Sequence, residues 1–302
     1  MKIYELKNKE LIVKIKSVGA ELTSISDALT QMEYLWCGDA KYWGRQSPVL
    51  FPIVGNVKNK EYRWKGKTYP MGQHGFARDM EFCMTKETAD EIWFVANDDE
   101  ETRKRYPFSF ALHIGYKLKG RKVTVMWRVE NKEEEKLPFS IGAHPAFSCP
   151  PDENGRQTDC YLITDAKQEL IYGGINMETG MLIRGIQKHL PLDEDGAFRI
   201  TEHLFDEDAL VIEGEQVHTL SLAGADKKPY VTVHFDMPLC GIWSPAKKNA
   251  PFICLEPWCG RCDAEDFDGE FDEREYGIVL GKGEEFCTSY DMCFAVSENK
   301  TD

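Results

Sequence analysis

Residues 251–260 read PFICLEPWCG, and the alternation within this stretch is typical of a β-strand. Because successive side chains of a β-strand point to opposite faces, every second residue from Phe252 to Glu256 shares one face, and the apolar residues between them share the other. Glu256 thus lies on a mainly apolar face. We expect Pro257 to end the strand, which would place Glu256 at a strand end beside a cleft.

The same period of two recurs along the chain, and helical patterns are scarce. Strands are predicted at ELIVKIK (10–16), KVTVMWRV (122–129) and YVTVHF (230–235), and a hairpin at 61–71. One short helix is predicted through DDEETRKRY, capped by Asn97 and ended by Pro107. Many short strands with few helices predict an all-β sandwich or barrel and argue against an α/β fold.

Length and composition favour one domain with a small-molecule ligand. No repeat, low-complexity tract or linker interrupts the strand pattern, so we expect a single domain over residues 1–302. A formal charge of −14 repels phosphate backbones and anionic lipid, so nucleic acid and membranes are poor partners. The sequence has no apolar run of about 18 residues, and its start, MKIYELKNKE, lacks the apolar core of a signal peptide. We therefore expect a cytoplasmic protein.

Ten cysteines are scattered mostly through apolar runs, a pattern typical of reduced, buried thiols rather than of a disulfide framework. WCGRC (258–262) imitates a thioredoxin-type motif, but no βαβ unit surrounds it, and the acidic stretch that follows disfavours a thiolate. That stretch, AEDFDGEFDERE (264–275), partly fits an EF-hand loop, yet Ala264 occupies the first ligand position and no amphipathic helices flank it. We expect neither redox chemistry nor a metal site at these residues.

Three side chains are candidates for acid–base chemistry. Burial disfavours an ionised carboxylate, so Glu256 should have a raised pKa, which suits a general base near neutral pH. His74 in QHGFARD and His144 in SIGAHPAFSCP have small neighbours or an adjacent proline, which present an imidazole to a ligand. The alternative is that all three are paired or packed structural residues. The histidines predicted to be structural or on the surface are His113, His189, His203, His218 and His234.

Two arginines and a tryptophan are candidates for substrate binding. Arg45 in GRQSPVLFP and Arg78 in HGFARD are cations within apolar sequence. They are suited either to pairing with an acid such as Asp79 or Glu256, or to binding substrate oxygens or a phosphate. Trp243 in GIWSP is suited either to the core or to packing against a sugar ring. The residues alone leave these choices open.

Taken together, six segments resemble the aldose 1-epimerase (galactose mutarotase-like) family, and more specifically its LacX-type branch. They are GRQSPVLFPIVGN, HGFARDMEF, YPFSFALHIGYKL, SIGAHPAF, HLFDEDALVIEG and PFICLEPWCG. Their combination is far more specific than any one of them. The resemblance implies a β-supersandwich of large antiparallel sheets, no cofactor, and reversible conversion between the α- and β-anomers of a free aldose.

The resemblance also implies roles for individual residues. Glu256 matches the family's base, which takes the proton from the anomeric hydroxyl, and His144 matches the acid that protonates the ring oxygen. His74 matches a second histidine that binds and polarises the sugar. Trp243 matches an aromatic residue that lines the cleft. Asp208 matches an aspartate that binds sugar hydroxyls, although its acidic neighbours at 206 and 207 are alternatives for that role.

One position departs from the family pattern. Many relatives have an arginine that contacts the sugar where this chain has Asn56, which can hydrogen-bond a hydroxyl but supplies no charge or bidentate fork. Arg45 and Arg78 are candidates to compensate. Both also fall near arginines that resemble the phosphate ligands of glucose-6-phosphate 1-epimerases in the same superfamily.

The sequence therefore favours an aldose 1-epimerase acting on a hexose. A hexose-6-phosphate 1-epimerase and a non-catalytic carbohydrate-binding protein of the same fold are the alternatives, and a thiol oxidoreductase is the weakest reading. Retention of an acid and a base together favours turnover over binding alone. Edge strands allow either a monomer or a homodimer.

Overall fold

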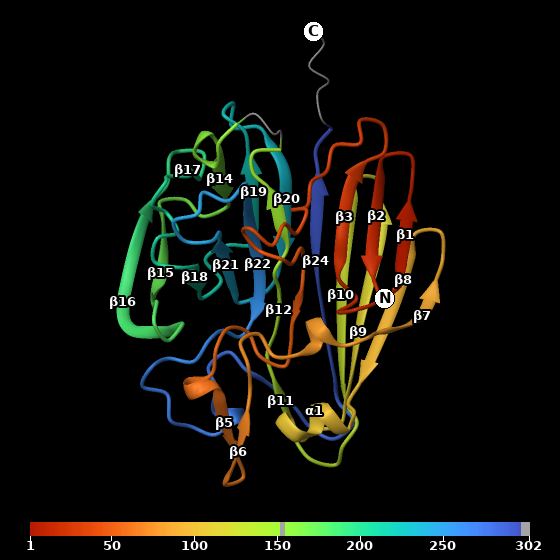
Figure 1. Cartoon of the computed structure of the whole chain (residues 1–302). Coiled ribbons are helices and arrows are strands. Elements are labelled where there is room, and N and C mark those ends of the chain that lie inside the picture. The colour runs from red at the N-terminus through yellow and green to blue at the C-terminus, as the bar shows by residue number, and fades with distance from the viewer. Residues whose placement is uncertain (152–154, 297–302) are drawn as a thin grey trace.

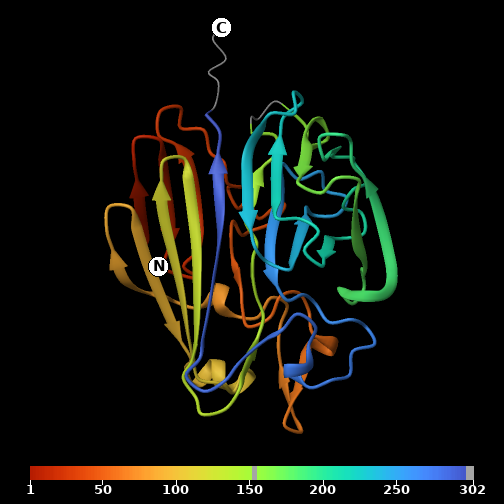
Figure 2. The same ribbon diagram turned by 180° about the vertical axis from the view of Figure 1, so that it is seen from behind.

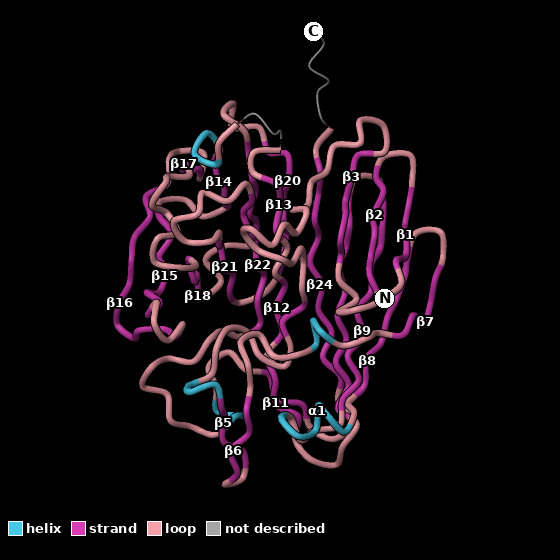
Figure 3. The backbone as a smooth tube through the Cα atoms, viewed as in Figure 1, coloured by secondary structure: helices cyan, strands magenta, loops and turns pink. Residues whose placement is uncertain are grey.

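The computed structural model describes residues 1–151 and 155–296, and strands dominate it (Figure 3). Its largest sheet has nine strands in the order β17 (Ala197–Arg199), β14 (Tyr161–Thr164), β19 (Thr219–Ala223), β20 (Pro229–Phe235), β24 (Glu285–Phe294), β10 (Lys122–Asn131), β9 (Phe110–Lys119), β8 (Glu91–Asn97) and β7 (Cys83–Glu87). Neighbouring strands pair in antiparallel fashion, as in β9–β10. This arrangement confirms the all-β prediction.

A second sheet of eight strands carries the stretch 251–260. Its order is β16 (Met181–Pro191), β15 (Glu169–Asn176), β18 (Leu210–Glu213), β21 (Leu239–Trp243), β22 (Phe252–Cys259), β12 (Ile141–Ala143) and β4 (Val49–Leu50), with β13 (Ala146–Ser148) also pairing with β22. The smaller sheets are β1 (Ile3–Lys7), β2 (Leu11–Lys16) and β3 (Leu22–Asp27); β5 (Glu61–Trp64) and β6 (Lys67–Pro70); and β11 (Leu137–Phe139) and β23 (Ile278–Leu280).

The sheets form two layers. In Figure 1 the three-stranded and eight-stranded sheets lie in front, and Figure 2 shows the nine-stranded sheet on the opposite side. Val13 of β2, Trp127 of β10 and Leu255 of β22 belong to one hydrophobic cluster, so the main core lies between the layers. Antiparallel sheets packed through apolar inner faces account for the period of two in the sequence.

The strand β22 is longer than predicted, because Pro257 does not end it. Residues on its two faces separate as expected: Leu255 packs in the main core, whereas Cys254 belongs to a different cluster. The strand continues to Cys259 because the neighbouring ladder is interrupted between β12 and β13, opposite Pro257, so the missing N–H breaks no paired contact there. Glu256 therefore lies inside the strand and faces that interruption.

The helix is present where predicted, but a different residue caps it. It is α1 (Glu100–Arg105), and Asp99 accepts the Thr102 N–H as its N-cap; Asn97 is the last residue of β8. Asp99 caps the helix because its side chain reaches the third helical N–H, whereas Asn97 is still extended. No helix within the described residues is long and apolar enough to cross a membrane. The short 3₁₀ segments are Lys58–Lys60, Ala77–Asp79, Gln157–Asp159 and Phe271–Glu273.

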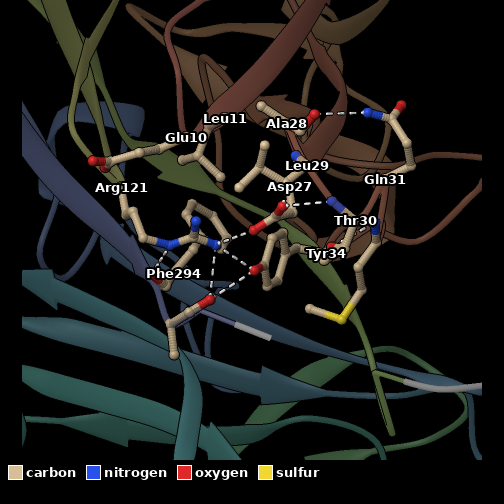
Figure 4. Close-up of polar contacts among 12 residues, drawn as sticks. Glu10, Leu11, Asp27, Ala28, Leu29, Thr30, Gln31, Tyr34, Arg121 and Phe294 are labelled. Atoms are coloured by element: carbon tan, nitrogen blue, oxygen red, sulfur yellow. Dashed lines mark hydrogen bonds and ion pairs between the residues drawn. The ribbon is translucent and has the colours of Figure 1, made fainter. Parts of the chain in front are cut away.

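A single arginine ties the C-terminal strand to the three-stranded sheet (Figure 4). Arg121 donates from Nε to the Phe294 carbonyl at 2.9 Å and from Nη2 to Asp27 Oδ2 at 2.8 Å. The same Nη2 lies 2.7 Å from the Tyr34 hydroxyl. Asp27 and Tyr34 are buried, so these contacts satisfy polar groups that would otherwise be costly to remove from water.

Candidate active site

One cavity of about 330 Å³ gathers most of the predicted site residues. Six of them line it: His74, Arg78, His144, Asp208, Trp243 and Glu256. They come from segments far apart in the sequence. His144, Asp208, Trp243 and Glu256 lie in or next to strands of the eight-stranded sheet, and His74 and Arg78 lie in the segment between β6 and β7. The volume lies near the lower end of the range for small-molecule sites, roughly 300–1,000 Å³.

His144 and Glu256 form the centre of this cavity. His144 lies between β12 and β13, in the interruption that faces β22, and its Nδ1 is 3.4 Å from Glu256 Oε2. Both residues are buried. Neither of these two atoms has a hydrogen-bond partner among the described residues. Two unpartnered polar atoms facing each other in a cavity indicate groups arranged for a ligand.

Burial shifts the pKa of both groups away from their ordinary values. Removal from water raises the pKa of the Glu256 carboxyl well above its usual range, and the Asp208 carboxylate raises it further; the Trp258 N–H offsets part of the increase. Burial, with the positive charges of Arg78 and Arg45, lowers the pKa of His144 to about 3. Both shifts favour the neutral form of each group in the empty cavity.

His74 is fixed by two hydrogen bonds to one residue. Its backbone N–H donates to the Gly55 carbonyl at 2.8 Å, and the Gly55 N–H donates to its Nδ1 at 3.1 Å. Nδ1 is therefore an acceptor, so neutral His74 carries its proton on Nε2. Burial and the neighbouring His144 imidazole, whose ring centre is 5.5 Å away, lower the pKa of His74 and keep it neutral.

The backbone at His74 has the left-handed conformation, with φ of 63°, and Gly75 follows with φ of 68°. A Cβ at Gly75 would lie 2.2 Å from the Phe51 carbonyl oxygen, so only glycine fits. A non-glycine residue held in this conformation at a ligand cavity is typical of a functional position.

Aromatic side chains hold the His144 ring. Trp43 stacks on it with ring centres 4.6 Å apart and an interplanar angle of 27°, and Trp243 contacts it edge-on at 5.4 Å. Trp43 lines the cavity but was not predicted as a site residue. The signal available was its place two residues before Arg45 in a conspicuously aromatic stretch, KYWGR.

A third tryptophan is wedged between two glycines. A Cβ at Gly241 or at Gly142 would lie 2.3 Å or 2.5 Å from atoms of the Trp258 ring. The Trp258 indole N–H donates to the Ala143 carbonyl at 3.1 Å. The ring is therefore locked in the cavity wall beside Glu256, and the two glycines leave the room that it needs.

The two predicted arginines differ in position. Arg78 lines the cavity; its Nη2 donates to the Gln73 carbonyl at 2.9 Å. Its buried Nε has no hydrogen-bond partner within the described chain and lies 4.0 Å from Asp79 Oδ2. Arg45 does not line the cavity, and its Nη2 pairs with Asp79 Oδ1 at 2.8 Å. Of the two roles that the sequence left open for Arg45, the structure thus shows the ion pair with an acid.

Of the three adjacent acids at 206 to 208, only Asp208 faces the cavity. Asp206 pairs with His203 at 2.8 Å, and Glu207 pairs with Lys188. Asp208 has φ of 74°, a second left-handed non-glycine residue in the cavity wall. The geometry therefore favours Asp208, the residue that the family motif also indicates.

Asn56 lines a cavity that adjoins the catalytic cavity and does not line the catalytic cavity itself. The chain turns at Gly55, which has φ of 70°, and the Asn56 side chain lies against Gly180 in an adjoining cavity of about 750 Å³. Motif matching does not detect the left-handed turn at Gly55, which sets the direction of the chain at Asn56.

The surroundings of the cysteine motif at 258–262 and of the acidic stretch at 264–275 indicate structural roles for both. Burial raises the pKa of Cys259 to about 12 and of Cys262 to about 11, and the two thiols pack in different clusters. Protonated, buried thiols are poor nucleophiles. In the EF-hand-like stretch, Asp266 pairs with Arg184 at 2.9 Å and Asp268 with Arg63 at 3.1 Å, so arginines neutralise these acids.

Among the described residues, one group has the spacing to hold a metal ion. Ligand atoms of His144, Cys254 and Glu256 all lie within 4.8 Å of one another. Burial and the Glu256 charge raise the pKa of the Cys254 thiol well above its usual range, so it is protonated near neutral pH. The arrangement is therefore better suited to moving a proton than to holding a cation.

A sequence model of the family described as aldose 1-epimerase matches residues 2–289. The chain belongs to the aldose 1-epimerase family. Within it, the chain is 34% identical over 264 residues to the chromosomal and plasmid LacX proteins of Lactococcus lactis subsp. lactis, covering 85% of this chain and 87% of theirs. This likeness confirms the resemblance to the LacX-type branch.

Solved structures of this aldose 1-epimerase fold are also similar. A galactose mutarotase related enzyme from Lactobacillus acidophilus is 34% identical with a TM-score of 0.93, and all of both chains is covered. A galactose mutarotase-like protein from Lactobacillus casei ATCC 334 is 27% identical with a TM-score of 0.89, covering 97% of this chain and 100% of that one. The fold is that of the galactose mutarotase-like proteins, and the family is one of carbohydrate epimerases.

Proposed function

We propose that this member of the family is an aldose 1-epimerase that interconverts the α- and β-anomers of a hexose. The observation that carries the proposal is the buried pair of His144 Nδ1 and Glu256 Oε2, 3.4 Å apart and unpartnered within the described residues. Anomer exchange needs one acid and one base on a ring bearing hydroxyl groups, and this pair supplies both.

Ring opening starts from the charged form of the pair, which arises from the neutral form when the Glu256 proton passes to His144. The Glu256 carboxylate takes the proton of the anomeric hydroxyl, and the freed electron pair on that oxygen forms the carbonyl bond at C1. The bond between C1 and the ring oxygen breaks at the same time, and the ring oxygen takes a proton from His144. Atoms and charges balance within the pair and the sugar, so no cofactor is needed.

Ring closure runs through the same groups in the opposite sense. After opening, Glu256 is protonated and His144 is neutral, the form that burial favours in the empty cavity. Rotation about the C1–C2 bond exposes the other face of the aldehyde. His144 then takes the proton of the attacking hydroxyl while Glu256 protonates the carbonyl oxygen. Both forms of the pair hold one proton, so no proton from outside is required.

The surrounding side chains suit sugar binding and orientation. The Nε2–H of neutral His74 is a hydrogen-bond donor to the sugar, and the Asp208 carboxylate is an acceptor for hydroxyls. Trp243 presents an aromatic surface against which the C–H groups of a sugar pack. Trp43 fixes the plane of the His144 imidazole, which is a positioning role.

A hexose-6-phosphate 1-epimerase is the second candidate. In its favour, Arg78 lines the cavity, and its buried Nε has no hydrogen-bond partner within the described residues, with Asp79 Oδ2 at 4.0 Å. Against it, Arg45 is engaged by Asp79 outside the cavity, which leaves a phosphate with one arginine instead of two. The test is two-dimensional NMR exchange on glucose, galactose and their 6-phosphates. Faster exchange of the free hexoses supports the proposal, and acceleration of the 6-phosphates alone would replace it by the second candidate.

The carbohydrate-binding alternative makes a different prediction for the same samples. A protein that only binds would show heat of binding in calorimetry but leave the exchange rate at its spontaneous value. Binding without turnover would therefore overturn the proposal, since the acid–base pair would then have no catalytic role.

A further inference from the structure

Two buried carboxylates lie at the two ends of strand β3, and they make the same kinds of contact. Glu21 directly precedes the strand, and Asp27 is its last residue. In each carboxylate, one oxygen accepts two backbone N–H groups and the other oxygen pairs with a cation. Removal of an ionised carboxylate from water is costly, so a fold keeps such a group only where its contacts matter.

The backbone groups that Asp27 holds are close to it in the sequence. Its Oδ1 accepts the N–H groups of Leu29 and Thr30, both at 2.9 Å, and its Oδ2 pairs with Arg121 at 2.8 Å (Figure 4). Leu29 and Thr30 lie in the turn that follows β3, and none of these residues lines the catalytic cavity. Asp27 therefore has a structural role, the closure of a turn.

The backbone groups that Glu21 holds are remote from it in the sequence. Its Oε1 accepts the N–H groups of Gln46 and Ser47, both at 2.9 Å, and its Oε2 pairs with Lys16 at 2.6 Å. The Gln46 side chain also donates to β3, at the carbonyl of residue 23, at 2.6 Å. The stretch 43–47 is thus fixed to the three-stranded sheet, and it begins with a tryptophan that lines the catalytic cavity.

The stretch 43–47 is also bonded to the segment that carries His144. The Ala146 N–H donates to the Gln46 carbonyl at 2.9 Å, and Ala146 lies two residues after His144. At the start of the stretch, Trp43 stacks on the imidazole with ring centres 4.6 Å apart. One stretch therefore contacts both the backbone segment and the ring of His144.

A second tryptophan links these two contacts to each other. The Trp36 backbone N–H donates to the Ala146 carbonyl at 2.9 Å, and the Trp36 indole N–H donates to the Trp43 carbonyl at 2.9 Å. Trp36 is buried, so these bonds are shielded from water. A displacement of the stretch 43–47 would therefore reach the imidazole by two routes.

The turn before Glu21 also contacts the segment of Arg78. The Gly19 N–H donates to the Met80 carbonyl at 2.7 Å, and a Cβ at Gly19 would lie 2.7 Å from the Arg78 carbonyl oxygen. Burial lowers the pKa of Arg78, and the charge of Glu21 is one of those that raise it. The buried carboxylate thus balances part of the positive charge beside the cavity.

From these contacts, and resting on the proposed function, we propose that Glu21 is a positioning residue for the acid–base reaction. Glu21 does not line the catalytic cavity. It holds the stretch 43–47, and through that stretch it keeps His144 in the orientation that proton transfer with Glu256 requires. Since a displacement of about 1 Å at a reacting group can lower a rate by about a hundredfold, loss of this contact should be measurable.

Two substitutions at Glu21 separate its hydrogen bonds from its size. Glu21→Met removes both oxygens at the same side-chain length, whereas Glu21→Gln keeps an oxygen that can accept both N–H groups. In NMR exchange with glucose, we expect Glu21→Met to lower kcat by about tenfold or more with KM within about twofold, because the groups that bind the sugar are unchanged. Glu21→Gln should keep kcat within about threefold of wild type. An unchanged kcat in Glu21→Met, or equal losses in both variants, would overturn the inference.

Asp27→Leu is the matched control, because it also removes a buried carboxylate that accepts two N–H groups. Both Asp27→Leu and Glu21→Met should lower the urea concentration at the midpoint of unfolding, since each leaves two N–H groups without their acceptor. Only Glu21→Met should lower kcat. If Glu21→Met does not fold, Glu21→Asp replaces it, because the shorter side chain moves the oxygen away from both N–H groups; the same fall in kcat is expected, and its absence overturns the inference.

The NMR resonance of the His144 ring proton on Cε1 reports the position of the imidazole directly. The stacked indole of Trp43 shifts this resonance, so Trp43→Leu gives its value for an unstacked ring, and its loss in His144→Gln identifies it. Glu21→Met should move the resonance in the same direction as Trp43→Leu does, whereas Glu21→Gln and Asp27→Leu should leave it in place. An unmoved resonance in Glu21→Met would contradict a positioning role even if kcat fell.

Failure of this inference is distinct from failure of the proposed function. Anomer exchange by wild type that Glu21→Met leaves unchanged overturns only the inference. If wild type exchanges no sugar, the catalytic proposal fails, and the His144 resonance then decides the inference: a shift in Glu21→Met supports a positioning role for Glu21, and an unmoved resonance overturns it.

Discussion

His144 Nδ1 lies 3.4 Å from Glu256 Oε2, and neither atom has a hydrogen-bond partner within the described residues. An unsatisfied buried polar atom destabilises a fold by about 1–3 kcal/mol, so two of them facing one cavity are a cost that a structural pair would avoid. A bound sugar supplies a hydroxyl to one atom and a ring oxygen to the other. An acid–base role for the two residues explains why the fold keeps two unsatisfied atoms here, whereas a structural role does not.

The pH profile of kcat/KM should show no loss of activity near the pKa of an ordinary histidine, about 6.5. In the free enzyme, activity needs one proton on the pair; a second proton binds His144 with a pKa of about 3, and the single proton leaves Glu256 with a pKa raised well above its usual range. We expect kcat/KM to change by less than about twofold between pH 5 and pH 6.5 and to fall on the alkaline side. NMR exchange rates, corrected for spontaneous mutarotation, measure it. A tenfold fall on acidification to pH 5 would contradict these pKa directions.

The two arginines should respond differently to substitution. Arg78 lines the cavity and its charge lowers the pKa of His144, so Arg78→Met should lower kcat/KM for glucose by about tenfold and move the acid limb to higher pH. Arg45→Met is the comparison, since Arg45 pairs with Asp79 outside the cavity and lowers the pKa of His144 less than Arg78 does, so its loss should be smaller, within about twofold of wild type. Comparable losses in both variants would show that Arg45 contributes to the site as much as Arg78.

Gly75 should be intolerant of a side chain. Alanine there must adopt φ of 68° and place its Cβ 2.2 Å from the Phe51 carbonyl oxygen, so Gly75→Ala should lower the free energy of unfolding by more than about 2 kcal/mol and displace His74. Gly66→Ala is the control, with φ of 73° and no atom near its Cβ, and should cost only about 1 kcal/mol. Urea unfolding of both variants measures the difference; equal effects would mean that the close contact has no cost.

The Arg121 contacts predict an acid-sensitive stability. Burial alone raises the pKa of Asp27, but hydrogen bonds from the Thr30 and Leu29 N–H groups and from Arg121 outweigh it, so its pKa is below the ordinary value. A lowered folded-state pKa stabilises the fold above the unfolded pKa, near 3.9, and this contribution is lost as pH falls through the folded pKa.

Arg121→Met should therefore lower the free energy of unfolding by about 2 kcal/mol near neutral pH, where Asp27 is charged and loses its partner. The deficit should begin to shrink below pH 4 and be lost as pH falls through the folded pKa of Asp27, which is below its ordinary value, because the carboxylate is then protonated. Urea unfolding at pH 6 and pH 3 tests this, and a deficit that is unchanged at pH 3 would show that the ion pair is not its source.

The strand period predicted the all-β fold because sheets with one buried face impose alternation directly on the sequence. It assigned Glu256 and Leu255 to opposite faces correctly. It could not show which strands are neighbours. The prediction that Pro257 ends the strand was wrong for this reason, because the cost of a missing N–H depends on whether a partner strand is present opposite it.

Motifs predicted most of the cavity because they mark where the backbone comes close to a ligand. They missed Trp43, which stacks against His144, and could not show that Asn56 lies in the adjoining cavity, after a left-handed turn at Gly55. Both positions concern side-chain direction, which depends on backbone dihedrals and on neighbours distant in the sequence.

The most direct test of the central proposal is polarimetry on freshly dissolved α-D-glucose with wild-type protein and with Glu256→Gln. Glutamine keeps the size of the side chain but cannot take a proton, so we expect wild type to accelerate the change in rotation and the variant to lose about 10²–10⁴-fold in kcat/KM. Thermal unfolding of the variant should show a stability no lower than that of wild type, because no buried carboxyl is left to ionise. A folded Glu256→Gln variant that exchanges anomers as fast as wild type would contradict the assignment of Glu256 as the base.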